Sequence, residues 1–339
     1  MTGEGAGRIG VVGLGLVGGS LARLLAARGA VVVATDVDAG TRADARAVGL
    51  RVADDLAGLC AADPEVVVLA VPLRAVRATA AELAPLLAGG DATVTDVGSV
   101  KGPVRAAVVA AGLGDRYVGA HPMAGTEHSG FGASDAALLD AAPWAVTVAE
   151  PGAAAPDEPR RLAQVLRLVT GPLAGTAAVV TDDRHDEAAA LVSHVPHVLA
   201  TQLLNAVAGA PVRDLALGLA AGSFRDGTRV ALTDPARTEA MVTENAAWVA
   251  PALRKVVRDL EVVIGALETN GALHEVFHAA DDVRELRAGG RPRPAGPEEG
   301  LPVGDGWTAG VVDALVARCT AGAVVVGVDD GTVRVRAPR

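Results

Sequence analysis

The stretch Arg8-Ile9-Gly10-Val11-Val12-Gly13-Leu14-Gly15-Leu16-Val17-Gly18 decides the fold of the first half of this chain. A short β-rich run leads directly into Gly-x-Gly-x-x-Gly, and residues 19–28 follow with helical apolar spacing. A second strand, residues 30–35, ends in Asp36, which comes 18 residues after Gly18. The glycines alone are a weak signal, but strand, glycines, helix, strand and acid in this order predict a dinucleotide-binding βαβ unit.

The glycine run has a physical role in such a unit. Glycine permits the tight turn, the close approach to a pyrophosphate and close helix packing, and the helix N-terminus offers N–H groups to the phosphates. Asp36 would accept hydrogen bonds from the adenosine ribose and repel a 2′-phosphate, so NAD is expected rather than NADP. The alternative is that the glycines only pack a βα turn. The expected cofactor contacts are Gly13, Gly15, Leu16, Val17, Gly18, Asp36, Val71 and Pro72.

Strands and helices continue to alternate up to residue 181. Runs at 65–71, 92–96, 117–120, 144–148 and 177–181 predict further strands, and segments 73–87, 103–111 and 160–170 predict helices between them. The run at 65–71 is almost continuously apolar, as in a sheet that is buried on both faces. Residues 8–181 are therefore expected to form a Rossmann-type, doubly wound α/β domain.

Strand patterns end at residue 181, and residues 182–288 are expected to form an all-helical domain. Asp182 and Asp183 are expected to cap a long helix that runs to about residue 207, and Pro196 should kink its axis. Ser193 and His197 are four residues apart and share a face of this helix, although a plain surface pair is an equally good interpretation. A second long helix is expected over residues 245–268.

Two further expectations concern assembly and the tail. The helices of the second domain are so rich in alanine and leucine that they would leave an apolar face if isolated, so we expect a homodimer through this domain. Residues 289–339 begin with a Gly/Pro linker at 289–294, followed by a helix at 308–319 and a hairpin at 323–335. This tail is too short for a core of its own, and the sequence assigns it no function.

Composition narrows the possible partners. The chain has 339 residues, half of them hydrophobic, and a net charge of −10 without a Lys/Arg-rich run, so nucleic acid and membrane surfaces are not expected partners. Cys60 and Cys319 suggest no disulfide framework, and neither a leader segment nor an apolar stretch of ~18 residues is found, so a cytoplasmic protein is expected. His194-x-x-His197 and His274-x-x-x-His278 have ligand-like spacing, but no third ligand cluster accompanies them, so no metal is expected.

Two segments offer chemistry. His121 opens the run His121-Pro122-Met123-Ala124-Gly125-Thr126-Glu127 after the predicted strand at 117–120. Ligands of α/β domains bind at the C-terminal ends of strands, and an imidazole there suits proton transfer near neutral pH. A histidine satisfied within a turn is the simpler interpretation of this run alone. In the helical half Arg229, followed by Val230-Ala231-Leu232, is the best candidate for binding an anion.

Five motifs occur in one order along the chain, and together they give it a resemblance to a known family. Gly13-x-Gly15-x-x-Gly18 is the first and His121-Pro122-Met123-Ala124-Gly125-Thr126-Glu127 the third. The other three are Asp96-Val97-Gly98-Ser99-Val100-Lys101, Ser193-His194-Val195-Pro196-His197 and Phe224-Arg225-Asp226-Gly227-Thr228-Arg229. Over residues 8–285 the chain resembles the prephenate/arogenate dehydrogenase family of tyrosine biosynthesis.

The resemblance implies NAD-dependent oxidative decarboxylation of prephenate to 4-hydroxyphenylpyruvate. Hydride would leave C4 of the cyclohexadienol ring, and the ring carboxylate would depart as carbon dioxide. The resemblance further implies that His121 accepts the proton of the 4-hydroxyl group, that Ser99 hydrogen-bonds the same hydroxyl, and that Arg229 pairs with a substrate carboxylate. It places Ser193, His197 and Thr126 on the substrate side, and Glu127 and Asp226 where they control access.

One departure from the family pattern leaves the substrate open. After Thr233-Asp234-Pro235 the family commonly has a tryptophan three residues on, and this chain has Thr238. Arogenate and 4-amino-4-deoxyprephenate therefore stand beside prephenate as candidate substrates. A β-hydroxyacid dehydrogenase, with Lys255 as its candidate catalytic lysine, and an inactive NAD-binding protein are the alternatives from other classes. The tail is also shorter than a regulatory ACT domain.

Overall fold

The computed structural model describes residues 7–288, 295–304 and 306–338, so the predicted Gly/Pro linker at 289–294 lies outside the described residues. The first half is built on a parallel four-stranded sheet in the order β2-β1-β3-β4. These strands are fully buried, which explains their continuous apolar sequences. Their bounds are β1 Ile9–Val12, β2 Val32–Thr35, β3 Val66–Leu69 and β4 Thr93–Asp96.

Helices cover both faces of this sheet, as the predicted doubly wound fold requires. Ile9, Val11 and Leu21 belong to one apolar cluster, and Val12, Leu69 and Leu83 belong to another, so alternate residues of β1 serve the two faces. Strand β1 has β2 on one side and β3 on the other, and the chain crosses from β2 past β1 to reach β3. The carboxyl end of β1 is therefore the switch point where a dinucleotide would bind. The helices are α1 Leu16–Ala27, α2 Ala39–Ala47, α3 Leu56–Cys60, α4 Val76–Leu86 and α5 Gly102–Ala110.

A second sheet of six strands lies beside the first, in the order β5-β6-β7-β9-β10-β8. Strand β5 runs antiparallel to β6, β7 runs parallel to β6, and helix α6 (Glu158–Thr170) packs on β6 and β7. The two sheets are joined where Tyr117 bridges to Val94, just before β5 begins. The strands are β5 Gly119–Pro122, β6 Pro143–Val148, β7 Thr176–Thr181, β8 Glu298–Pro302, β9 Val324–Asp329 and β10 Thr332–Arg336.

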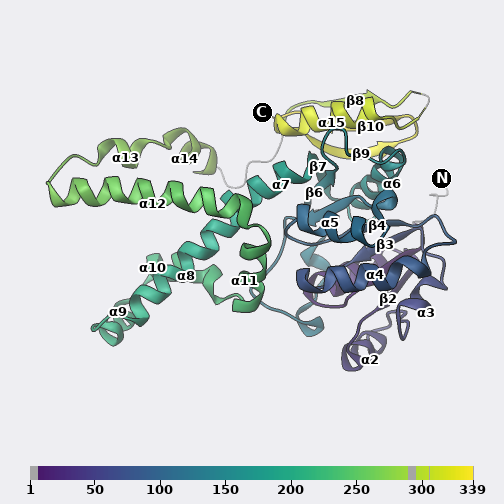
Figure 1. Cartoon of the computed structure of the whole chain (residues 1–339), viewed down its shortest axis with the longest axis horizontal. Coiled ribbons are helices and arrows are strands. Elements are labelled where there is room, and N and C mark those ends of the chain that lie inside the picture. Colours follow the sequence, from purple (N-terminus) through teal and green to yellow (C-terminus); the bar gives the residue numbers. More distant parts are fainter. Residues whose placement is uncertain (1–6, 289–294, 305, 339) are drawn as a thin grey trace.

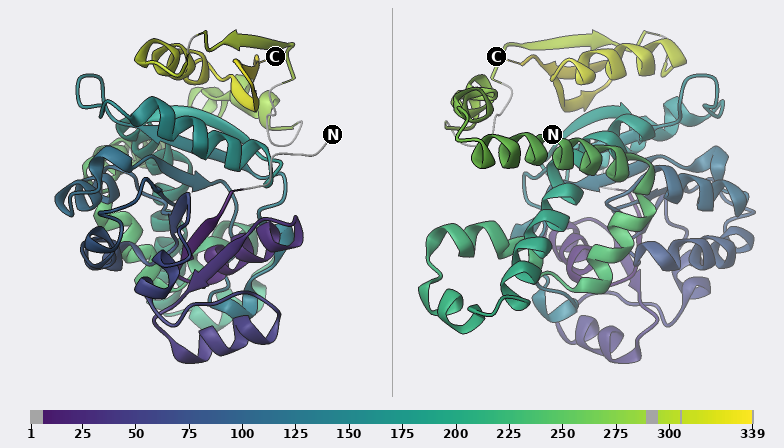
Figure 2. Two further views of the ribbon diagram at one scale, coloured as in Figure 1. Left: turned by 90° about the vertical axis from the view of Figure 1, so that its right-hand side faces the viewer. Right: turned by 60° about the vertical axis from the view of Figure 1, so that its left-hand side comes forward.

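The tail contains one strand more than the predicted hairpin, and it joins the second sheet. Its helix α15 (Ala309–Thr320) and the β9–β10 hairpin are confirmed, but residues 298–302 form an additional strand that pairs with β10. Ala177 of β7 pairs with Val325 of β9, so the tail extends the second sheet. Figures 1 and 2 show this segment in yellow at the end of the molecule opposite α2.

The region after β7 is helical up to residue 288, as predicted. The expected long helix from residue 182 is present but contains a π-helical turn, Ala190–His194, directly before Pro196. A widened turn relieves the clash of a proline ring with the carbonyl four residues earlier. The helices are α7 Asp182–Ala189, α8 Val195–Ala208, α9 Arg213–Leu219, α10 Gly222–Thr228, α11 Pro235–Glu244, α12 Ala246–Glu268, α13 His274–His278 and α14 Asp281–Ala288.

The helical region has a very small core of its own. Its buried apolar cluster contains only Ala190, Val195 and Val249 among the described residues. Helix α12 projects away from the two sheets (Figure 1), and Val249 is its single buried residue in the isolated chain. No helix in the described ranges combines the length and apolar character needed to cross a bilayer.

Candidate active site

The glycine loop has the geometry expected of a pyrophosphate cradle. Gly13 has a φ of +96°, and a Cβ there would lie 2.5 Å from the carbonyl oxygen of Ala70. A Cβ on Gly18 would collide with Gly13, because α1 packs tightly against the turn. Gly15, in contrast, has no atom within 4 Å of the position of a Cβ, so the space above the N-terminus of α1 is open. The chain therefore leaves room for a phosphate beside the positive end of a helix.

Asp36 stands beside this loop as predicted. Its Oδ2 accepts the amide N–H of Leu14 at 2.7 Å, and its Oδ1 accepts that of Asp38 at 2.9 Å. The carboxylate is thus fixed at the end of β2, next to the glycines. Val71 also borders the loop, because its Cγ1 is 3.2 Å from the position of a Cβ on Gly13. Pro72 is exposed at the start of a 3₁₀ turn.

The position of His121 corrects one expectation. We expected it to follow a strand at 117–120, but it lies inside β5, paired with Ala145 of β6 in an antiparallel ladder. The misplacement arises because Tyr117 and Val118 run beside β4 before the chain turns to pair with β6. His121 is consequently held by backbone hydrogen bonds on a rigid strand, whereas a loop would leave it free to move.

A buried polar cluster fixes the backbone next to His121. The Lys101 ammonium, which is fully buried, donates to a carboxylate oxygen of Asp96 and to the carbonyl of Ala120 at 2.7 Å. The Tyr117 hydroxyl donates to the other Asp96 oxygen at 2.8 Å. Since Asp96 and Lys101 flank Ser99 in sequence, the same cluster also fixes the loop that carries this serine. Ser99 is half-buried between them.

The His121 imidazole contacts a second histidine that the motifs did not include. Its Nδ1 lies 2.9 Å from Nε2 of His185, whose own Nδ1 lies 2.7 Å from Oδ1 of Asp186. The two Asp186 oxygens also receive the backbone N–H groups of Lys101 at 2.8 Å and Gly102 at 2.9 Å. His185 and Asp186 are buried and lie on α7, so this helix reaches both His121 and the start of α5.

Desolvation lowers the pKa of both His121 and His194. The pKa of His121 is held well below the usual range, first by desolvation and then by the nearby His185, Lys101 and His194. Desolvation also lowers the pKa of His194 to about 4, although Asp186 opposes the shift. The lowered pKa favours the neutral form of His121, which is the form that can accept a proton.

The Ser193–His197 motif begins in the π-helical turn and continues into the first residues of α8. His197 Nδ1 is 2.8 Å from the carbonyl oxygen of Ser193, which places the two half-buried residues together as their spacing predicted. Between them, His194 is fully buried, and its Nδ1 receives a hydrogen bond from the Asn245 amide at 2.9 Å. The same amide donates to the backbone carbonyl of Asp186 at 2.8 Å, so Asn245 joins the start of α12 to α7.

The residues expected to bind the substrate carboxylate and to control access are exposed. Arg229 is exposed at the start of a 3₁₀ turn (Arg229–Leu232) that packs on α8, the helix of His197. Arg225 pairs with Asp226 at 3.2 Å, so its charge is already engaged. Within the described residues the Arg229 guanidinium has no ion pair, and it remains the better candidate for an anion.

The loop after His121 meets α11. Glu127 is exposed in this loop, and the half-buried Thr126 precedes it. The Arg237 guanidinium of α11 donates to the backbone carbonyl of Thr126 at 3.1 Å. Arg237 directly precedes Thr238, which replaces the tryptophan of the family pattern. Arg237 of α11 therefore contacts the loop that carries Thr126 and Glu127.

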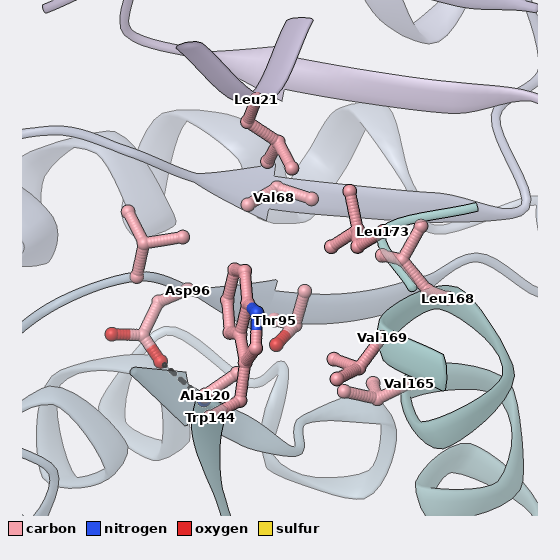
Figure 3. A pocket seen from close by; sticks show the side chains of 11 residues that line it. Leu21, Val68, Thr95, Asp96, Ala120, Trp144, Val165, Leu168, Val169 and Leu173 are labelled. Atoms are coloured by element: carbon pink, nitrogen blue, oxygen red, sulfur yellow. Dashed lines mark hydrogen bonds between the residues drawn. The ribbon is translucent and has the colours of Figure 1, made fainter. Parts of the chain in front are cut away.

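A small cavity between the two sheets is not the active site. It is lined mainly by apolar side chains of α1, α6 and strands β3 to β6, and Figure 3 shows the Trp144 and Thr95 side chains facing it. The Trp144 Nε1 and the Thr95 Oγ1 are buried without a hydrogen-bond partner in the described structure. The cavity, which Asp96 also lines, is a packing feature of the core between the two sheets. Nowhere in the described chain do three His, Cys, Asp or Glu side chains gather in a way that could hold a metal ion.

The architecture is that of a nucleotide-binding oxidoreductase, and comparison with known proteins identifies the family. The chain matches the nucleotide-binding domain of prephenate dehydrogenase over residues 21–180 and its dimerization domain over residues 181–279. The chain belongs to the prephenate dehydrogenase family.

Individual relatives agree with this assignment. The cyclohexadienyl dehydrogenase of Zymomonas mobilis is 34% identical over 279 residues, which cover 80% of this chain and 92% of that protein. A Corynebacterium glutamicum protein provisionally named prephenate dehydrogenase is 31% identical, with a TM-score of 0.81 over 94% of this chain and 98% of that one. The prephenate dehydrogenase of Aquifex aeolicus, in complex with hydroxyphenyl propionate and NAD+, is 28% identical, with a TM-score of 0.74 over 85% and 99% of the two chains.

Proposed function

We propose that this chain catalyses the NAD-dependent oxidative decarboxylation of prephenate to 4-hydroxyphenylpyruvate. The observation that carries the proposal is His121, a half-buried imidazole with a lowered pKa on a rigid strand, next to the loop that holds Ser99. NAD bound at the glycine loop would supply the hydride acceptor. The dinucleotide bound by the Aquifex relative, the open space at Gly15 and the carboxylate of Asp36 support this cofactor.

The chemistry of the site follows from these side chains. His121 accepts the proton of the ring hydroxyl, and Ser99 hydrogen-bonds the same oxygen and orients the ring. Arg229 pairs with a carboxylate of the dianionic substrate, which needs a fixed cation in a protein of net charge −10. Ser193, His197 and Thr126 line the substrate side, while Glu127 and Asp226 are exposed where they would control access.

Arogenate and 4-amino-4-deoxyprephenate remain the competing substrates. The relatives of this chain include a cyclohexadienyl dehydrogenase as well as prephenate dehydrogenases, and Thr238 stands where the family commonly has a tryptophan. We further propose that the enzyme is a homodimer joined through its helical part, as the match to a dimerization domain supports. Cys60 and Cys319 are unpaired, which supports a reducing compartment such as the cytoplasm.

The decisive experiment is an assay of NADH formation with prephenate, arogenate and the amino analogue in parallel. We expect prephenate to give the highest kcat/KM. His121→Asn should lower kcat by about 10²–10⁴-fold, the usual contribution of a general base, while leaving NAD binding unchanged. If His121→Asn turns over at the normal rate, the histidine is structural and the mechanism is wrong.

The acid side of the pH profile provides a second check. The base acts only when it is deprotonated, so kcat/KM should fall as the pH drops through the pKa of His121. Because desolvation lowers that pKa, the fall should begin below the usual histidine range of about 6.5. A profile that already declines above neutral pH would contradict this assignment.

A further inference from the structure

We propose that His185 and Asp186 are positioning residues that fix the tautomer of His121. The proposal rests on the proposed function and deepens it. It starts from a linear chain of three side chains, His121, His185 and Asp186, whose hydrogen-bond directions can be assigned one after another from the acceptor at its end. Neither His185 nor Asp186 is needed to contact the substrate for this role.

Each carboxylate oxygen of Asp186 accepts a backbone hydrogen bond. Backbone N–H groups can only donate, and those of Lys101 and Gly102 point one at each carboxylate oxygen. Both oxygens therefore act as acceptors, so the short contact to His185 places a proton on Nδ1 of that histidine. We assign His185 a single ring proton, which leaves its Nε2 as an acceptor.

The second step fixes His121. His185 Nε2 can only accept, so the 2.9 Å contact requires His121 Nδ1 to donate. The proton of neutral His121 is thus committed to Nδ1, and its lone pair stays on Nε2. Nε2 is the atom that then accepts the hydroxyl proton of the substrate. In the other tautomer Nε2 would already carry a proton and could not act as a base.

The same chain offers the charged form of His121 a hydrogen-bond acceptor, although His185 is itself one of the groups that lower the pKa of His121. When Nε2 takes a proton, His121 becomes an imidazolium whose Nδ1–H still points at Nε2 of His185, with the Asp186 carboxylate behind it. The other groups near His121 are unfavourable to this charge: Lys101 at the start of α5 and His194 in the π-helical turn both repel it, and Asp96 on β4 is engaged by Lys101. Asp186 is connected to His121 only through His185.

Asp186 also holds the loop of Ser99 in place. Its two backbone contacts are the first N–H groups of α5, directly after the loop of Ser99. One carboxylate thus holds the loop of Ser99, the start of α5 and, through His185, the base. We infer that α7 aligns the base and the hydroxyl-binding serine as one unit.

The test compares three substitutions with a matched surface pair. In Asp186→Asn the amide can donate to His185 Nδ1, which reverses the chain and puts the proton of His121 on Nε2. We expect kcat to fall by about 10²–10⁴-fold, with the KM for substrate and the Kd for NAD little changed. His185→Leu should lose a comparable amount, whereas His185→Gln keeps an acceptor towards His121 and a donor towards Asp186, so its turnover should stay well above that of His185→Leu.

His278 and Asp281 form the control pair. Both lie on the surface, outside the candidate site, and His278 Nδ1 is 2.7 Å from Asp281 Oδ2. The pair thus repeats the histidine–aspartate contact of His185 and Asp186. His278→Leu and Asp281→Asn should leave kcat and the acid side of the pH profile unchanged. Equal turnover in His185→Gln and His185→Leu would show that the hydrogen-bond direction is irrelevant and would overturn the proposal, as would normal turnover in Asp186→Asn.

A measurement that does not depend on activity separates this proposal from the proposed function. Nitrogen-15 NMR of the seven imidazole side chains reports which ring nitrogen carries the proton, and His121→Asn identifies the signal of His121. We expect the Nδ1–H tautomer in the free wild-type protein and the Nε2–H tautomer in Asp186→Asn. An Nε2–H tautomer in the wild type would refute the proposal. Absence of dehydrogenase activity, together with the expected tautomer, would refute the proposed function instead.

Discussion

Asp36 is bound to the glycine loop through the amide of Leu14, so the residue that we propose to select the cofactor is held directly by that loop. A carboxylate at this point favours the ribose hydroxyls of NAD and repels the 2′-phosphate of NADP. Arg42 lies close by, since its guanidinium donates to the backbone carbonyls of Asp36 at 2.7 Å and Val37 at 3.0 Å. A cation is thus within reach if the carboxylate is removed.

We predict that Asp36→Ser shifts preference from NAD towards NADP. Loss of the ribose contact should lower kcat/KM for NAD by about 10–100-fold, the equivalent of one charge-assisted hydrogen bond. NADP use should rise, because repulsion disappears and Arg42 can approach the phosphate. Asp38→Ser is the matched control, since this carboxylate only caps α2 through Thr41. A ratio of NAD to NADP use that is the same in Asp36→Ser and wild type would contradict the role of Asp36.

Arg229 gives the second prediction at the level of single residues. A guanidinium grips a carboxylate with two parallel hydrogen bonds, which lysine cannot reproduce, so Arg229→Lys should raise KM and Arg229→Ala should raise it further. The expected loss is about 1.5–3 kcal/mol, or roughly one to two decades in affinity. NAD affinity should be unchanged. Arg225→Ala serves as the control, because Arg225 is already paired with Asp226. A KM effect in Arg225→Ala alone would show that the other arginine binds the substrate.

Motifs in the sequence could predict His121, Ser99 and Arg229, but not the chain behind the base. His185 and Asp186 occur in the run Asp182-Asp183-Arg184-His185-Asp186-Glu187, which looks like the solvated first turn of a helix. The structure buries positions 182, 185 and 186 and exposes 183 and 184, a helical periodicity of polar residues. Hydrophobic patterning cannot detect such a face, because the residues that are buried are polar.

At the level of elements, the start of α7 shows why this polar face is stable. We expected Asp182 and Asp183 to cap the helix, but the Thr181 side chain accepts the Arg184 N–H at 3.4 Å and is the cap. Asp182 instead receives the guanidinium of Arg105 on α5. Asp182 and Asp186 are one turn apart and both face α5. The carboxylates of Asp182 and Asp186, on one face of α7, therefore hold this helix against α5 and the loop of Ser99.

We predict that Arg105→Met destabilises the fold strongly. Arg105 also contacts Glu158 of α6 at 3.4 Å and lies 5.0 Å from the centre of the Tyr117 ring, so its removal leaves two buried carboxylates without their cation. Breaking such a pair typically costs about 3–5 kcal/mol, measurable as a lower free energy of unfolding in urea. Arg160→Met is the control, because its ion pair with Asp91 is exposed and should contribute at most about 1 kcal/mol.

The pH dependence of that loss identifies its cause. Desolvation raises the pKa of Glu158, and Arg105 opposes the rise, so Arg105→Met should raise this pKa further. A carboxyl whose folded pKa is raised destabilises the fold at high pH, and the cost disappears as it is protonated. The deficit of Arg105→Met should therefore be larger at pH 8 than at pH 5. An equal deficit at both values would mean that lost packing, and not unpaired charge, is responsible.

At the level of the whole molecule, the tail was the part that sequence patterns described least well. The hairpin was predicted from its turn and alternating valines, but β8 reads Glu298-Glu299-Gly300-Leu301-Pro302, which has no strand signal of its own. It becomes a strand because β10 supplies a partner, and pairing between distant segments cannot be seen in local sequence. Val325 and Val333 join the large core cluster, so the tail is part of the same folded body as the second sheet.

The remaining whole-molecule feature is the apolar surface of the helical part. The exposed side chains of α12 include Val257, Leu260, Ile264 and Leu267, at spacings of three and four residues, so they form one stripe along the helix. An apolar stripe of this length on a projecting helix is typical of a subunit interface. It also explains why the buried cluster of the helical region is so small in one chain: the second subunit would complete it.

We therefore predict that the wild-type protein is a dimer by light scattering at micromolar concentration, and that Leu260→Glu combined with Ile264→Glu makes it a monomer. Two carboxylates in the stripe would have to be buried without partners, which costs more than the interface can supply. Val109→Glu is the control, since this valine is about equally exposed (54%) but lies on α5, away from the helical part. A monomeric wild type, or a dimer that survives the double substitution, would contradict assembly through α12. If assembly does depend on this stripe, the double variant should also lose thermal stability, because the small core of the helical part would face solvent.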